Sequence, residues 1–129
     1  MRRALATPLL AVVLTLLFLP PAARAQAESV AVIPASGSQS ETFLFLGKGF
    51  SPGAVLVVAF AAPDGQIIGW YQKGTSDPFI ITADELGSWA FSVLPSEELV
   101  GFPLGEWTAT FCLVGSHEYC YSGTFTITD

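Results

Sequence analysis

The chain ends in two stretches of strict apolar–polar alternation, and this pattern constrains the fold more than any other feature. Alternation of this kind is typical of β-strands, because successive side chains point to opposite faces of a sheet. The two stretches are residues 107–114 and 119–127, and a three-residue loop at 115–117 would join them. We therefore expect an antiparallel hairpin in which Cys112 lies opposite Cys120 on the outer face. The positions expected to face the core are Trp107, Ala109, Phe111, Leu113, Tyr119, Tyr121, Gly123, Phe125 and Ile127.

The earlier part of the chain, from residue 28, also consists of short strand-like segments separated by turns that contain Gly and Pro. This organisation is typical of an all-β sandwich or barrel. A polar loop is expected at 35–40, and a single helical turn is expected at 95–99. The expected strands are Ser29–Ile33, 42–46 (ended by Gly47), 54–61, a return strand after Pro63-Asp64-Gly65, 79–82 and 88–94.

The turn Pro63-Asp64-Gly65 sets the register of the hairpin around it, since Pro favours the first turn position and Gly accepts positive φ. The register pairs Phe60 with Ile68 and places Leu56, Val58, Phe60, Ile68 and Trp70 on one face, which we assign to the core. The opposite face carries Val55, Val57, Ala59, Ala61, Ile67 and Tyr71. Because this second face is unusually apolar, we predict that it contacts a protein partner by packing or strand addition, with a covering loop as the alternative.

Residues 1–27 have the pattern of a secretory signal peptide. Arg2 and Arg3 precede an uncharged apolar run at residues 9–19, and two overlapping Ala-x-Ala cleavage sites follow at residues 23–27. The apolar run is shorter than the roughly 20 residues that span a bilayer. We therefore predict a signal peptide at 1–27 and one domain at 28–129, secreted or periplasmic and without a stable membrane anchor.

Cysteine content and charge narrow the partners of this domain. An even number of cysteines in an exported chain favours a disulfide, here Cys112–Cys120. Residues 28–129 hold two lysines, Lys48 and Lys73, against eleven Asp and Glu residues, a formal charge of −9. This charge argues against nucleic acid and against anionic lipid surfaces as partners. An extracellular or envelope protein, or a polysaccharide, is the expected partner.

Residues 47–57 contain a Gly-x-Gly-Phe-x-Pro-Gly run followed by an alternating strand. Together with the Pro63-Asp64-Gly65 turn, the segment 83–91 and the final hairpin, this run resembles bacterial extracellular immunoglobulin-like domains, with a similar pattern in fibronectin III-like modules. The resemblance spans roughly residues 42–127. It implies an Ig-like antiparallel β-sandwich of seven or eight strands that acts as a spacer, adhesion or binding module and carries no catalytic residue. The Cys112–Cys120 pair departs from the family pattern.

Residues suited to catalysis are sparse. His117 is the single histidine, and it lies at the expected tip of the last hairpin. No Gly-x-Ser-x-Gly nucleophile motif is present, and the adjacent Glu97 and Glu98 would point apart on a helical turn. We predict that the protein is not an enzyme and binds no cofactor.

Two ligand classes remain as alternatives. Calcium would use the loop carboxylates of Asp64, Asp77, Asp84 and Glu85, although these lack the regular spacing of calcium loops, and no metal site is predicted. A small carbohydrate-binding module would use an exposed aromatic ring, which the register assigns to Tyr71, or to Trp70 if the register shifts by one residue. The main prediction is a secreted, non-catalytic Ig-like domain with a binding, adhesion or envelope-structural role.

Overall fold

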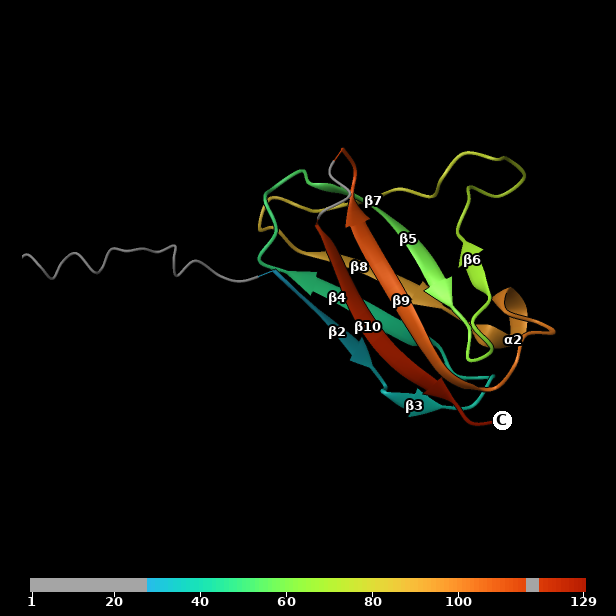
Figure 1. The fold of residues 1–129 in the computed structure, drawn as a ribbon. Coiled ribbons are helices and arrows are strands. Elements are labelled where there is room, and N and C mark those ends of the chain that lie inside the picture. Colours follow the sequence, from blue (N-terminus) through green and yellow to red (C-terminus); the bar gives the residue numbers. More distant parts are fainter. Residues whose placement is uncertain (1–27, 116–118) are drawn as a thin grey trace, which may run out of the picture.

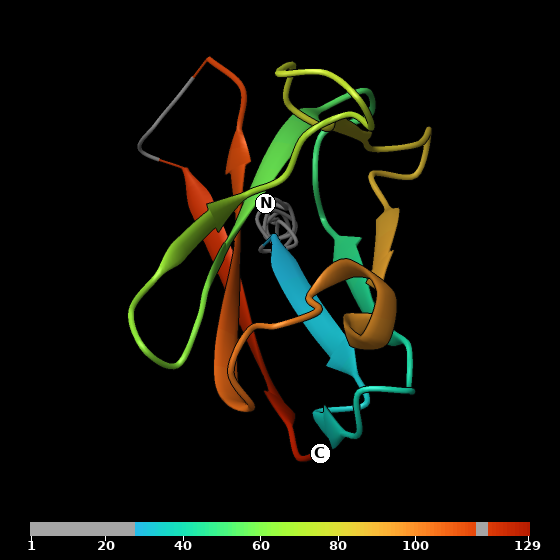
Figure 2. The same ribbon diagram turned by 90° about the vertical axis from the view of Figure 1, so that its right-hand side faces the viewer.

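A computed structural model describes residues 28–115 and 119–129, which form two β-sheets packed face to face (Figures 1 and 2). The all-β sandwich is therefore confirmed, while the predicted signal peptide and His117 lie outside the described residues. The three-stranded sheet has the order β2 (Ser29–Ile33), β4 (Phe43–Lys48) and β8 (Trp89–Val93). The six-stranded sheet has the order β3 (Ser36–Gly37), β10 (Cys120–Ile127), β9 (Gly105–Leu113), β5 (Val55–Ala61) and β6 (Ile67–Gly69), and β7 (Ile81–Thr82) also pairs with β5.

Both predicted hairpin registers are present. Cys112 pairs with Cys120, and the pairing continues to the end of β10. Phe60 pairs with Ile68, and the Ala62 N–H donates to the Gln66 carbonyl across the turn at a distance of 2.8 Å. In each hairpin the turn residues and the alternation require the same register, which explains why sequence alone identified it.

Some element boundaries differ from the prediction because tertiary contacts set them. The strand β4 continues through Gly47 to Lys48, since both residues pair with β2 and Gly47 also pairs with Trp89 of β8, whose indole packs over it. The expected loop at 35–40 contains the two-residue strand β3, which pairs in parallel with the end of β10. The strand β7 contains only Ile81 and Thr82, whereas the sequence predicted a strand at 79–82. A single helical turn, α2 (Pro95–Glu98), lies near its expected place, and no helix among the described residues is long and apolar enough to cross a membrane.

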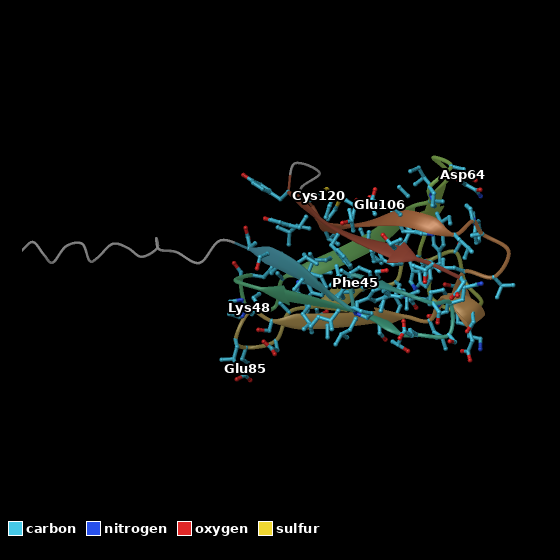
Figure 3. The ribbon with its side chains drawn as sticks, turned by 90° about the horizontal axis from the view of Figure 1, so that it is seen from below. Phe45, Lys48, Asp64, Glu85, Glu106 and Cys120 are labelled. Atoms are coloured by element: carbon cyan, nitrogen blue, oxygen red, sulfur yellow. A yellow bond between two sulfur atoms is a disulfide. The ribbon has the colours of Figure 1, made fainter. Side chains whose placement is uncertain are left out.

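The core between the sheets is built mainly from aromatic rings. Phe45 lies at its centre (Figure 3), and its ring centroid lies 5.4–6.2 Å from four other phenylalanine rings. Trp107 is fully buried, and its indole N–H donates to the Pro103 carbonyl at 3.0 Å. No polar or charged side chain is buried in the described part of the chain. Hydrophobic burial therefore dominates the stability of this fold.

The two sides of the sandwich are closed differently. On one side, the chain passes from β2 to β3 and so from one sheet to the other, and Val32 packs against Gly123 of β10. On the opposite side the sheets end at β8 and at β6 with β7, and these strands form no ladder with one another. Aromatic side chains fill this side instead: Trp70 and Phe79 both contact Phe91 of β8.

Candidate binding face

The outer face of the six-stranded sheet brings together most of the residues predicted to form a partner surface. Val55 and Val57 of β5 are half-buried there, and Ile67 of β6 is 68% exposed. The pairing of Ala61 with Ile67 and of Ala59 with Gly69 places β5 and β6 side chains on the same face. We call this set the apolar strip. It consists of Val55, Val57, Ala59, Ala61, Ile67 and Tyr71.

Tyr71 completes the apolar strip just beyond the end of β6, where it forms an isolated bridge with Pro78. Its ring lies over Gly69, because a Cβ atom built on Gly69 would come within 2.8–3.0 Å of the tyrosine ring atoms and hydroxyl. The tyrosine side chain is 56% exposed. Trp70 points to the other side of the sheet, with its ring centroid 5.0 Å from that of Phe60. Trp70 is thus part of the core packing and does not share a face with Tyr71.

The neighbouring half of the same face carries small hydroxyl side chains. Thr108 and Thr110 of β9 lie opposite Thr124 and Ser122 of β10, and the Thr110 and Ser122 hydroxyl oxygens are 3.3 Å apart. Ala59 and Ala61 of β5 pair with these two threonines of β9. The face therefore changes from apolar to hydroxyl-bearing across the sheet, and no large side chain lies between the two halves.

The predicted disulfide is present at one end of this face. Cys112 and Cys120 are bonded, with their Cα atoms 4.1 Å apart. This short separation fits a closely spaced cross-strand pair. Val57 pairs with Cys112, so the disulfide borders the apolar strip. The bond thus holds β9 and β10 in register beside the candidate binding face.

Charged groups are almost absent from this sheet. Glu106 is the single charged residue in its six strands, whereas residues 28–129 together carry a formal charge of −9. The acidic side chains lie mainly in turns, as Figure 3 shows for Asp64 and Glu85. A face without charges can be covered by a partner at little desolvation cost, because few charged groups lose their hydration.

Two of the four loop carboxylates considered for calcium, those of Asp64 and Asp84, accept backbone N–H groups within their own turns. The Asp64 side chain accepts the Gln66 N–H at 3.0 Å, and the Asp84 side chain accepts the N–H groups of Leu86 and Ser88 at 2.9 Å each. Asp77 lies in the turn after Tyr71, and Glu85 lies beside Asp84. The described residues hold no group of three or more His, Cys, Asp or Glu side chains suited to a metal ion.

Two further residues extend the apolar strip and were not singled out from the sequence. Ile80 immediately precedes β7 and is 50% exposed. Val114 follows β9, is 57% exposed, and donates its N–H to the Val55 carbonyl at 2.9 Å. The alternation along the strands could have identified both residues. Ile80 precedes the buried Ile81, and Val114 lies two positions after the outward-facing Cys112, so both positions fall on the outer face.

Comparisons with known proteins identify the fold but no family. No protein-family model matches the sequence, and no curated protein sequence matches it. Among solved structures, a tetra-tandem repeat from the extending region of a large adhesion protein aligns with a TM-score of 0.52 and 14% identity, covering 79% of this chain and 24% of that one. Macromomycin aligns with a TM-score of 0.50 and 18% identity, covering 79% of this chain and all of that one. At these identities the chain shares a β-sandwich fold with both proteins.

Proposed function

We propose that the protein is a secreted or periplasmic, non-catalytic Ig-like domain of bacterial type that binds an extracellular or envelope protein through its apolar strip. The observation that carries this proposal is an apolar surface on an almost uncharged sheet of a strongly acidic domain. Contiguous exposed apolar patches on soluble domains are typical of interaction sites. In this proposal, residues 1–27 direct export and residues 28–129 form the binding domain.

Strand order supports the Ig-like assignment. In immunoglobulin domains strands A, B and E share one sheet, and in variable-type domains strands G, F, C and C′ share the other. The order β2-β4-β8 and the order β10-β9-β5-β6 correspond to these two arrangements. The likeness to a repeat of an adhesion protein is compatible with an extracellular binding role.

The composition of the apolar strip favours a protein partner over a sugar. Its side chains are aliphatic apart from Tyr71, and aliphatic side chains gain free energy by burial against other apolar surfaces. Sugar-binding faces usually present several aromatic rings, each of which matches the C–H face of a sugar. The core face holds the other two aromatic residues of this hairpin, Phe60 and Trp70.

The proposal can be tested by capturing partners from the extracellular and envelope fractions of the source cells. We expect the wild-type protein to retain a defined partner that Ile67→Asp fails to retain. Leu86→Asp is the matched control, because Leu86 is 86% exposed in the turn before β8. Equal retention by wild type, Ile67→Asp and Tyr71→Ala would contradict the proposal.

Carbohydrate binding is the second candidate function, and the exposed Tyr71 ring is the observation that favours it. Pull-down on insoluble polysaccharides would then retain the wild type and Tyr71→Phe but lose Tyr71→Ala. Tyr119→Ala is the matched control: Tyr119 was expected to face the core, but it precedes β10 and is 54% exposed, close to the 56% of Tyr71. Retention of Tyr71→Ala at the wild-type level would exclude this ring as a sugar platform.

A further inference from the structure

The strand β8 forms an open edge of the three-stranded sheet. It pairs with β4 on one side, and no strand among the described residues pairs with it on the other. Figure 2 shows β8 at the border of its sheet, with the segment 83–88 above one end and α2 near the other. The N–H and C=O groups on the outer side of β8 are therefore available for pairing with another polypeptide.

The other edges of the sandwich are short or covered by packing, whereas β8, although β7 lies close to it, pairs with no strand of the described residues on its outer side. Pro34 follows β2 directly, and Val32 of β2 packs against Gly123 of β10. The edge strands β3 and β6 contain only two and three residues. β8 has five residues, Trp-Ala-Phe-Ser-Val, without Pro, Gly or a charge. Natural sheets usually block such an edge with a charge, a proline or a bulge.

The space beside β8 also has an apolar lining. Phe79 is 37% exposed, and its ring centroid lies 5.6 Å from that of Phe91 on β8. The Trp70 ring also contacts Phe91, with ring centroids 6.0 Å apart, and Trp70 is only partly buried. A strand added to β8 would direct alternate side chains toward these rings. Its other side chains would lie beside Ala90 and Ser92, whose side chains are small and exposed.

Acidic residues flank both ends of this edge. Asp84 and Glu85 precede β8, and Glu97 and Glu98 follow it in α2. Lys48, at the end of β4, reduces the negative charge at one end only. A second copy of the chain pairing through β8 would bring carboxylates against carboxylates at both ends, in either strand direction. Such like-charge contacts oppose self-pairing and favour a basic partner.

We propose that β8 accepts, by strand addition, an extended segment of another protein that has apolar residues at alternate positions and Lys or Arg at both ends. Main-chain hydrogen bonds to β8 supply affinity, and the two acidic ends select the charge of the segment. This site is separate from the apolar strip, so the inference does not depend on the proposed function.

The test uses synthetic peptides and the purified protein at low ionic strength. The probe is an extended peptide of alternating Val and Thr with paired Lys at each end. One matched peptide carries Glu in place of Lys, and another is N-methylated at alternate residues along one edge. Nuclear magnetic resonance titration reports the dissociation constant, and amide hydrogen exchange reports protection of β8.

We expect the Lys-ended peptide to perturb and protect β8 amides. The double variant Glu85→Lys/Glu97→Lys should bind this peptide about tenfold more weakly and should gain affinity for the Glu-ended peptide. The variant Glu106→Lys/Asp129→Lys changes net charge equally, but Glu106 lies in β9 and Asp129 follows the end of β10, so this variant should bind nearly as the wild type does.

Three outcomes would overturn the inference. They are an absence of β8 perturbation by the Lys-ended peptide, equal binding of the N-methylated peptide, and equal effects of the two double variants. Perturbation confined to the apolar strip would also overturn it, while leaving the proposed function intact.

Discussion

At the scale of single residues, Gly47 shows how one missing side chain sets the packing of the core. A Cβ atom there would overlap the Trp89 indole ring. Trp89 is only 5% exposed, and its ring packs against those of Phe50 and Phe111. Its indole N–H has no hydrogen-bond partner in the described part of the chain. Packing therefore holds this ring in place, and packing at this point requires glycine.

We predict that Gly47→Ala lowers the free energy of unfolding by about 3 kcal/mol, because the added methyl group forces the buried ring to move. Urea-induced unfolding measures the loss. Gly69→Ala is the control: its methyl group would meet the exposed Tyr71 ring, which can swing into solvent, so the cost should stay below about 1 kcal/mol. Equal losses for the two variants would contradict this account of Gly47.

Tyr121 gives the fold a dependence on alkaline pH. Burial, and then its hydrogen bond of 2.7 Å to the Glu28 carboxylate, raise the pKa of the phenol from 10.0 to about 12. The folded state thus favours the neutral phenol more than the unfolded state does. The resulting stability is fully present below pH 10 and is lost as the pH rises towards about 12.

Tyr121→Phe should remove this part of the pH dependence, because the substituted ring cannot ionise. The measurement is the thermal midpoint of wild type and variant at several pH values between 9 and 12. We expect the wild type to lose more stability than the variant over this range. Parallel curves would show that Tyr121 does not carry the effect.

At the scale of elements, the last hairpin combines two independent constraints. The alternation in β9 and β10 and the Cys112–Cys120 bond require the same register. We predict that replacing both cysteines by alanine lowers the free energy of unfolding by about 2.5 kcal/mol in the chain-entropy model. The aromatic core does not include either cysteine, so unfolding in urea should stay cooperative. Loss of a cooperative transition would mean that the bond is required for folding.

The hairpins could be predicted from sequence because their information is local. The turn at 63–65 and the alternation around it place Tyr71 and Ile67 on the outer face. The strand β3 and the continuation of β4 through Gly47 could not be predicted, since they depend on β10 and Trp89, which are distant in sequence. The open edge of β8 could also not be predicted from the sequence, because it exists only since β7 pairs with β5 and not with β8.

At the scale of the whole molecule, charge and apolar surface are segregated. Most acidic side chains of the described residues lie in turns and in α2, and the six-stranded sheet is almost free of charge. Residues 28–129 carry a formal charge of −9, so repulsion between copies of this part of the chain opposes contact between their apolar strips at low salt. Electrostatic repulsion acts over longer distances than apolar contact does. It therefore keeps the copies apart and leaves the apolar strip accessible to other partners.

Salt should weaken this repulsion between copies, since the electrostatic screening length falls to about 3 Å at 1 M salt. We predict that the wild-type protein is monomeric at neutral pH and low ionic strength and self-associates weakly in concentrated salt. Sedimentation velocity measures this change. Ile67→Asp places a charge in the apolar strip and should remain monomeric under both conditions, whereas Leu86→Asp should behave as the wild type does. If Ile67→Asp self-associates in concentrated salt as strongly as the wild type, then the copies do not contact one another through the apolar strip.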